Sequence, residues 1–208
     1  VQGLASQFAA LCVGAQPGQK VADLCAAPGG KSLTLAECMQ NQGKLISGEY
    51  VESRVPLLRK AFARCGVTCA KAVQNDAAQL RSDWGKFDRI LCDVPCSGLG
   101  VIAKKPDIRY KDLDGIENLL LSQQKILQNG ADLLAENGRL VYSTCTVNRD
   151  ENEEQVRTFL KNNPRFHVAV PAVQLPGMQQ GEYGTLFLPH KTATDGFFAA
   201  ILETESTQ

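Results

Sequence analysis

The chain has 208 residues, with 22 basic and 22 acidic side chains, so its formal net charge is +0. A hydrophobic content of 44% is ordinary for a folded domain and excludes a disordered chain. No apolar run approaches the roughly 20 residues of a membrane-spanning helix, and the N-terminus lacks the pattern of a signal peptide. The neutral charge balance argues mildly against a nucleic-acid-binding domain, because such domains are usually basic.

The predicted elements alternate between short apolar strands and helices. In chain order they are strand 20–25, helix 32–39, strand 44–49, helix 52–64, strand 68–73, strand 87–93, helix 116–136, strand 139–143, helix 151–162 and late strands 166–170, 185–188 and 196–203. Asn137-Gly138 is expected to end the long helix. This alternation favours one parallel sheet with helices on both faces, whose strand carboxyl ends meet at one ligand-binding edge.

The 8 cysteines are scattered through the chain, at a density well below the roughly 8–10% of a disulfide scaffold. We therefore expect reduced thiols and a cytoplasmic location. Two pairs of cysteines are spaced i,i+4, but no C-x-x-C motif occurs and both histidines lie far from these pairs in the sequence. This spacing gives little support for a zinc site, and we expect no bound metal.

A loop of small residues, Cys-Ala-Ala-Pro-Gly-Gly-Lys-Ser over 25–32, follows the first predicted strand and opens a helix. Small residues let the backbone approach a ligand closely, and N–H groups at a helix N-terminus favour carboxylate or phosphate. A P-loop needs glycine where Cys25 stands, and the G-x-G-x-x-G pattern of dinucleotide sites is absent. The loop therefore matches neither the P-loop nor the dinucleotide-binding motif.

Two carboxylates follow the next strands. Glu49 lies 19 residues beyond Gly30, close to the ~20 expected for a carboxylate that binds ribose hydroxyls; the alternative is a surface glutamate. Asp76 follows the third strand, where it could meet an adenine amino group or could cap the next helix. Together with the loop, they suggest an adenosine ligand without a diphosphate, and S-adenosylmethionine fits that description.

Two cysteines end neighbouring strands. Pro95 cannot continue a central strand, so the chain turns there and Cys96 lies at the sheet edge. Cys145 ends the following strand in the same way, and both thiols should face one cleft. A disulfide and simple burial of two small side chains are the alternatives.

Nucleophilic catalysis is the functional interpretation of these thiols. A thiolate that adds to carbon 6 of a pyrimidine makes carbon 5 nucleophilic toward a methyl sulfonium. Asp93 could stabilise charge on the activated base, and the cation of Lys31 would favour the thiolate.

The loop and the two cysteine segments belong to a larger set of sequence motifs, which lie at 2–6, 23–31, 93–98, 105–108, 143–146, 151–153 and 195–198. This set resembles the catalytic domain of the Sun (Fmu) family of RNA cytosine-5 methyltransferases over nearly the whole chain. The resemblance implies one catalytic domain over 1–208, with the α/β fold of Rossmann-like class I methyltransferases. That fold is a doubly wound, mostly parallel sheet with a C-terminal antiparallel strand. The implied cofactor is S-adenosylmethionine, with S-adenosylhomocysteine as product.

The resemblance also implies residue roles. Cys145 would attack carbon 6 of cytosine, Cys96 would assist release of the RNA adduct, and Asp93 would contact both the cofactor and the target base. The implied cofactor-binding residues are Cys25, Ala26, Ala27, Pro28, Gly29, Gly30, Lys31, Glu49, Arg54, Asp76 and Asp93. The alternative interpretation of Arg54 is a solvent-exposed charge on a helix. Glu49 departs from the family, in which aspartate is commoner, but the longer side chain should reach the same hydroxyls.

The expected substrate is RNA, with ribosomal RNA first and transfer RNA as the alternative. Other functions are a catalytically idle RNA-binding assembly factor and a methyltransferase for DNA, protein or a small molecule. Family members usually carry RNA-binding segments before the motif at 2–6, where this chain starts. We therefore expect that an extra RNA-binding segment or a partner supplies most of the affinity for RNA. Lys104, Lys105, Arg109 and Lys111 could line an RNA groove or form a solvated loop.

Overall fold

A computed structural model describes residues 2–110, 112 and 114–204. Its helices are α1 (Leu4–Cys12), α2 (Gly30–Cys38), α3 (Val55–Arg64), α4 (Ile116–Leu133), α5 (Glu153–Asn162) and α6 (Pro189–Thr192). Short 3-10 helices are η1 (Glu52–Arg54), η2 (Ser82–Trp84), η3 (Pro106–Tyr110) and η4 (Arg149–Glu151). The strands are β1 (Lys20–Asp23), β2 (Lys44–Glu49), β3 (Ala70–Gln74), β4 (Phe87–Asp93), β5 (Leu134–Thr144), β6 (Phe166–Ala169), β7 (Gln179–Gln180), β8 (Thr185–Phe187) and β9 (Phe197–Thr204).

The strands form one nine-stranded sheet in the order β3-β2-β1-β4-β5-β9-β8-β7, and β6 also pairs with β9. The strands β3, β2, β1, β4 and β5 are mutually parallel, whereas β9 runs antiparallel to β5. These findings confirm the predicted α/β fold with a parallel sheet and a C-terminal antiparallel strand. The predicted bounds of β2 and β4 agree with the structure.

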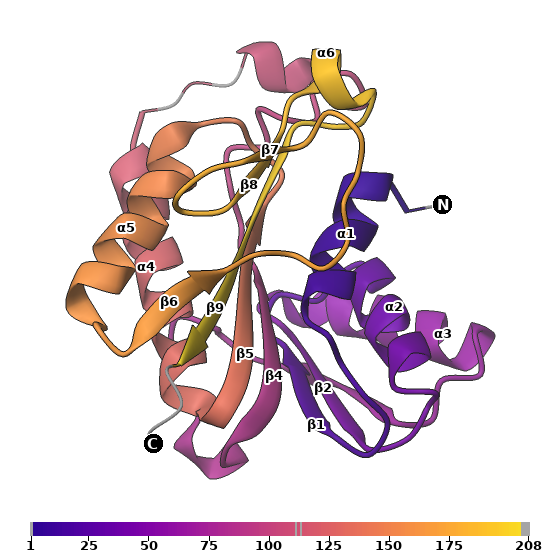
Figure 1. Cartoon of the computed structure of the whole chain (residues 1–208). Coiled ribbons are helices and arrows are strands. Elements are labelled where there is room, and N and C mark those ends of the chain that lie inside the picture. Colours follow the sequence, from indigo (N-terminus) through magenta and orange to yellow (C-terminus); the bar gives the residue numbers. More distant parts are fainter. Residues whose placement is uncertain (1, 111, 113, 205–208) are drawn as a thin grey trace.

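Helices cover both faces of the sheet (Figure 1). On one face, α4 and α5 bury Ile126, Leu127 and Phe159 in a cluster with the strands. On the other face, α1 and α2 bury Phe8 and Leu35. Each such side chain contributes roughly 1.5–3 kcal/mol when it is fully removed from water. This two-sided burial fixes the sheet and leaves the carboxyl ends of its parallel strands at one edge.

The prediction for the end of the long helix was wrong. Helix α4 ends at Leu133, and Leu134 already pairs with Phe87 of β4. The register between β4 and β5 shifts after this pair, and Asn137 has a φ of 58°. Asn137-Gly138 is therefore an irregularity within a long strand, because a left-handed residue followed by glycine suits a bulge as well as a helix end.

Two further differences concern helices. Helix α1 was not predicted from the sequence; it is a nine-residue amphipathic helix that buries its alanines and Phe8. No helix starts directly after Asp76; residues 77 and 78 form a turn instead. In the chain as described, no helix is long and apolar enough to cross a membrane.

Candidate active site

The loop between β1 and α2 crosses the edge of the sheet and is held by its own backbone. The Ala26 N–H donates to the carbonyl of Gly48 on β2 at 2.8 Å, and the Gly29 N–H donates to the Ala26 carbonyl at 2.7 Å. Gly29 has a φ of 107° and a Cβ there would lie 3.1 Å from Leu58 of α3. Glycine therefore suits both the backbone conformation and the packing at the start of α2.

Beneath the loop lies a buried polar cluster. Asp23 is fully buried, and one of its oxygens accepts a hydrogen bond from the Ser32 hydroxyl at 2.7 Å. Ser32 also contacts the Ser47 hydroxyl at 2.9 Å, which ties β1, α2 and β2 together. Burial raises the pKa of Asp23 to about 7, in spite of the opposing hydrogen bond from Ser32. Its other oxygen, Oδ1, has no hydrogen-bond partner among the described residues.

Glu49 ends β2 with its side chain turned into the protein, only 4% exposed. Its Oε1 accepts hydrogen bonds from the Val51 N–H at 2.9 Å and from Arg54 at 3.3 Å. The second guanidinium nitrogen of Arg54 donates to the Ala27 carbonyl at 3.1 Å. Arg54 thus links Glu49 to the glycine loop, although it is 45% exposed. Both hydrogen bonds that the described residues give the Glu49 side chain end on Oε1, which leaves Oε2 available to a ligand.

Asp76 stabilises a turn and does not cap a helix, which was the alternative to binding adenine. Its carboxylate accepts the Ala78 N–H at 2.9 Å and the Gln79 side chain at 3.2 Å. The preceding residue, Asn75, is 5% exposed and donates its backbone N–H to the Glu49 carbonyl at 2.8 Å. Its side-chain oxygen has no partner in the described part of the chain. The ends of β2 and β3 therefore bring three polar side chains together: Glu49, Asn75 and Asp76.

Lys31 and Asp93 form an ion pair at the carboxyl end of β4. The ammonium lies 2.7 Å from Asp93 Oδ2, and the two side chains are 14% and 25% exposed. Ser143 of β5 donates its hydroxyl to Asp93 Oδ1 at 2.8 Å, and the Lys31 ammonium lies 5.4 Å from the centre of the Phe197 ring. Burial disfavours the charged lysine, but the Asp93 carboxylate outweighs that effect and raises the pKa of Lys31.

The two cysteines meet beside this ion pair. The sulfur atoms of Cys96 and Cys145 are 3.3 Å apart, within hydrogen-bond distance. Hydrogen bonding by Cys96 lowers the pKa of the Cys145 thiol, and the Lys31 cation acts in the same direction. The same contact and burial raise the pKa of Cys96. Of the two, Cys145 therefore loses its proton more readily, with Cys96 as the hydrogen-bond donor. All eight cysteines lie among the described residues, and none forms a disulfide.

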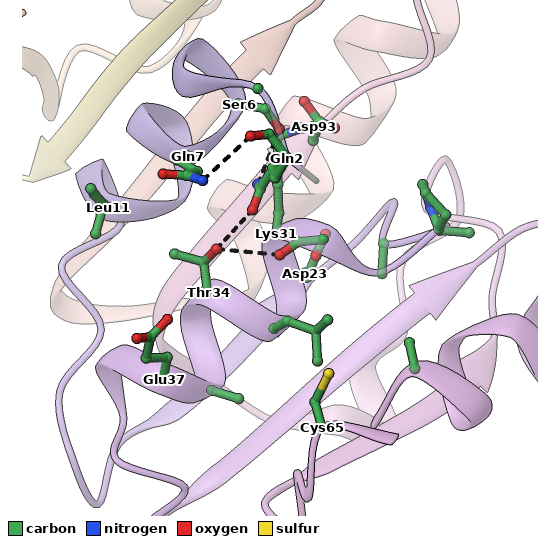
Figure 2. A pocket seen from close by; sticks show the side chains of 18 of the residues that line it. Gln2, Ser6, Gln7, Leu11, Asp23, Lys31, Thr34, Glu37, Cys65 and Asp93 are labelled. Carbon is green, nitrogen blue, oxygen red and sulfur yellow. Dashed lines mark hydrogen bonds and ion pairs between the residues drawn. The ribbon is translucent and has the colours of Figure 1, made fainter. Parts of the chain in front are cut away.

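A groove of about 1410 Å³ runs past these groups. Its lining includes the glycine loop, Lys31, Asp93 and Cys145, and it continues along α1 and α2. Figure 2 shows Lys31 and Asp93 near Gln2, with Glu37 and Cys65 farther along the groove. Glu49 and Asp76 lie outside this lining, at the ends of the neighbouring strands.

The structure therefore places the predicted residues in two groups. Lys31, Asp93, Cys96 and Cys145 converge where β4 and β5 end, and the glycine loop separates them from the group that holds Glu49, Arg54 and Asp76. No group of three or more His, Cys, Asp or Glu side chains suited to a metal ion occurs within the described ranges.

The predicted basic segment is placed only in part. Lys104 and Lys105 line the groove, and Lys104 pairs with Asp195 at 2.5 Å. Arg109 lies in η3 and is exposed. Lys111 lies outside the described residues.

Sequence reasoning missed several partners of these groups. Ser143 and Phe197 contact the ion pair, and Asn75 lies next to Glu49. Gln123 of α4 and Glu151 of η4 are fully buried beneath the two cysteines. Gln123 gave a signal in the sequence, because it is a polar residue on the apolar face of a predicted helix.

The whole chain was compared with known proteins. The model of the family described as 16S rRNA methyltransferase RsmB/F matches residues 10–203. The chain belongs to this family. The predicted resemblance to the Sun family is thereby confirmed.

Two relatives of this RsmB/F domain illustrate the range of the family. The probable ribosomal RNA small subunit methyltransferase B of Bacillus subtilis is 38% identical over 207 residues, which cover 95% of this chain and 46% of the relative. The tRNA (cytosine(72)-C(5))-methyltransferase of Pyrococcus horikoshii is 33% identical over 201 residues, which cover 97% of this chain and 51% of the relative. The chain thus spans about half the length of these curated relatives.

A solved structure agrees with the fold. The crystal structure of NSun6 from Pyrococcus horikoshii with SFG matches with a TM-score of 0.89 and 31% sequence identity. The match covers 99% of this chain and 53% of that chain. The similarity therefore extends over the whole arrangement of helices and strands described above.

Proposed function

We propose that this chain is the catalytic domain of an RNA cytosine-5 methyltransferase, with residues 1–208 forming that single domain. The contact that carries the proposal is the 3.3 Å approach of the Cys96 and Cys145 sulfur atoms beside the Lys31–Asp93 pair. Two thiols at one site suit a reaction in which a cysteine must first bond to the base and then leave it.

The residues around the glycine loop fit S-adenosylmethionine. Asp23 Oδ1 and Asn75 Oδ1 are buried oxygens without partners in the described structure, and Glu49 keeps Oε2 available. We assign the ribose to Glu49, the adenine to Asp76 and the surrounding loop to residues 25–31, with Arg54 holding Glu49 against Ala27. When bound, S-adenosylmethionine supplies a methyl group on a positively charged sulfur and is released as S-adenosylhomocysteine.

The reaction on the base uses the two cysteines in turn. The Cys145 thiolate bonds to carbon 6 of the cytosine, which makes carbon 5 a nucleophile for the methyl group. Asp93, held by Lys31 and Ser143, stabilises charge on the activated ring. Carbon 5 then loses its proton to a base, and the bond between carbon 6 and Cys145 breaks. Cys96 assists this last step, because its thiol can donate a hydrogen bond to the departing Cys145 sulfur.

Ribosomal RNA is the substrate that the family match favours, because its description and the Bacillus subtilis relative both name ribosomal RNA. Transfer RNA is the second candidate, supported by the Pyrococcus horikoshii relative. Both candidates share the chemistry above. The presence of both thiols argues against a catalytically idle assembly factor of the same fold.

Most of the RNA affinity is proposed to come from a further segment or a partner, because the chain has a net charge of +0 and phosphate contacts need surplus positive charge. Lys104, Lys105 and Arg109 are the local candidates for RNA contacts. The proposed place of action is the cytoplasm, in keeping with a ribosomal or transfer RNA substrate and reduced thiols.

The proposal is tested by the variant Cys145→Ala. Methyl transfer should be abolished while S-adenosylmethionine still binds, as measured with a radioactive methyl group and by calorimetry. Normal turnover would refute the nucleophile assignment. Bisulfite sequencing of cellular RNA, with and without the gene, then identifies the modified cytidine and distinguishes ribosomal from transfer RNA.

A further inference from the structure

A carboxylate that no part of the proposed reaction uses lies beneath the two cysteines. Glu151, at the end of η4, is fully buried. Its Oε2 accepts hydrogen bonds from the Ser97 N–H at 2.8 Å and from the Gln123 side chain at 3.0 Å. Its Oε1 accepts from the Ser97 hydroxyl at 2.5 Å and from Asn148 at 3.3 Å. Four donors therefore converge on one side chain.

These donors tie Glu151 to the segments that carry both thiols. Ser97 directly follows Cys96, and its hydroxyl also contacts the Thr146 hydroxyl at 2.8 Å. Thr146 directly follows Cys145. Gln123 reaches the same cluster from α4 and donates to the carbonyl of Pro95, the residue before Cys96, at 3.0 Å. The carboxylate thus binds the residue that follows Cys96 directly, and it reaches the residue that follows Cys145 through the Ser97 hydroxyl.

The backbone of Glu151 fixes the cluster to the sheet. Its carbonyl accepts the hydroxyl of the fully buried Tyr142 on β5 at 2.7 Å. Its neighbour Asn152 accepts the Thr144 hydroxyl at 2.6 Å and donates to the Thr146 carbonyl at 3.1 Å. The position of Glu151 is therefore determined from β5, and the Cys96 segment is held through its side chain.

The chemistry of the cluster is unusual for a merely structural role. None of the ion pairs among residues 2–110, 112 and 114–204 involves Glu151. A buried carboxylate without a cation is costly unless hydrogen bonds compensate it, and apolar side chains usually fill such a position more cheaply. Two of its four hydrogen-bond donors belong to Ser97, which directly follows Cys96.

We propose that Glu151 is a positioning residue that holds Cys96 against Cys145, so that release of the methylated RNA depends on it. This inference rests on the proposed function. Because Cys145 directly follows β5, the strand holds it in place, and it should still attack the base when Glu151 is changed. Cys96 should lose its place beside the departing sulfur, since Ser97 and Pro95 are then held less firmly.

Glu151→Gln is the decisive variant. It keeps the shape of the side chain but puts an amide nitrogen where two donors converge, so at least one contact to Ser97, Gln123 or Asn148 must be lost. Ser97→Ala is a milder second variant, which removes the hydroxyl but keeps the N–H bond. Glu154→Gln is the matched control, because Glu154 lies on α5 and pairs with Arg157, away from the thiols.

The first readout needs no RNA. The 208-residue chain is alkylated with iodoacetamide between pH 6 and pH 10, and mass spectrometry follows Cys145 and Cys96 separately. Loss of the Cys96 hydrogen bond should move the Cys145 profile to higher pH in Glu151→Gln and Ser97→Ala, with both variants still folded by circular dichroism. Profiles equal to those of the wild type and Glu154→Gln would overturn the proposal.

The second readout uses an unmodified transcript of bacterial 16S ribosomal RNA at low salt. At a pH chosen from the first readout, where Cys145 is deprotonated to the same extent in both proteins, Glu151→Gln should form the covalent protein–RNA adduct as the wild type does. It should release the adduct about 10²-fold more slowly, the scale of a misplacement of about 1 Å. A denaturing gel should show a shifted species that ribonuclease removes, as for Cys96→Ala. A wild-type release rate in Glu151→Gln refutes the inference alone, whereas absence of the adduct from Cys96→Ala, both with this transcript and with a transfer RNA transcript, refutes the proposed function.

Discussion

Removal of the Lys31 charge is expected to destabilise the chain and slow its chemistry. Lys31→Met keeps the volume of the side chain but leaves Asp93 without its cation at the end of β4. The two side chains are 14% and 25% exposed, so the pair lies between exposed pairs, worth about 0–1 kcal/mol, and fully buried ones, for which loss of one partner costs about 3–5 kcal/mol. We expect a loss of about 1–3 kcal/mol in the free energy of unfolding.

Thermal unfolding without ligand measures this loss. For a chain of this length, about 1 kcal/mol lowers Tm by roughly 2–4 °C, so Lys31→Met should lower Tm by roughly 2–12 °C. Asp93→Asn in the same chain should restore part of the loss, because the amide still accepts the Ser143 hydroxyl and carries no charge. Arg81→Met breaks an exposed pair with Asp83 and should leave Tm unchanged.

Additive losses of Tm in the two single variants and their combination would refute this reasoning. If Lys31→Met and Asp93→Asn lowered Tm independently of each other, the 2.7 Å contact would carry no coupling energy. An unchanged rate of Cys145 alkylation in Lys31→Met at neutral pH would also contradict the role of the lysine, because its cation favours the thiolate.

Three further predictions concern ligands and pH. Glu49→Ala should weaken S-adenosylmethionine binding by roughly 10–100-fold, the value of hydrogen bonds to a charged group; unchanged affinity by calorimetry would refute the ribose assignment. Asp23 has a pKa of about 7 in the folded chain against an ordinary value of 3.8, so the folded chain binds the extra proton and stability falls as pH rises between these values. The Tm of Asp23→Asn minus the Tm of the wild type should therefore increase from pH 4 to pH 7. A Tm difference that stays constant over this range would contradict the burial argument. The chain alone should bind RNA weakly and in a salt-sensitive manner, and a sub-micromolar Kd at physiological salt would overturn that view.

The sequence predicted the central strands well because their signals are local. Phe87–Asp93 is a short apolar run bounded by polar residues and proline, and the structure gives β4 the same bounds. The end of α4 could not be predicted in this way. Asn137-Gly138 is typical of a helix end, but pairing with β4 across a bulge outweighs that local preference.

The cysteine pair shows how topology adds to sequence. Cys96 and Cys145 are 49 residues apart in the chain, and the expectation that they meet followed from two neighbouring parallel strands with the same kind of ending. Their assigned roles, and those of the cofactor-binding residues, stay predictions. The string at 151–153 was among the motifs found in the sequence, but the contacts of Glu151 could not be predicted, because they depend on the simultaneous approach of β5, α4 and the Cys96 segment.

The neutral net charge of the chain has a narrower meaning in the structure. Lys31 is used inside the site, and Lys104 is paired with Asp195. Of the four lysine and arginine side chains that line the groove in the described part of the chain, two are thus paired with carboxylates, and Arg64 and Lys105 are left for phosphate groups. This supports the proposal that the chain supplies the chemistry and the cofactor site while most of the RNA affinity comes from elsewhere.

The central claim is that Cys145 bonds to the base and Cys96 assists its release. The most direct test is to trap the adduct with Cys96→Ala, digest the RNA and the protein, and sequence the modified peptide by mass spectrometry. The account predicts a cytidine bonded to the Cys145 sulfur and no such adduct in Cys96→Ala/Cys145→Ala. A cytidine on any other residue, or an adduct that persists without Cys145, would contradict it.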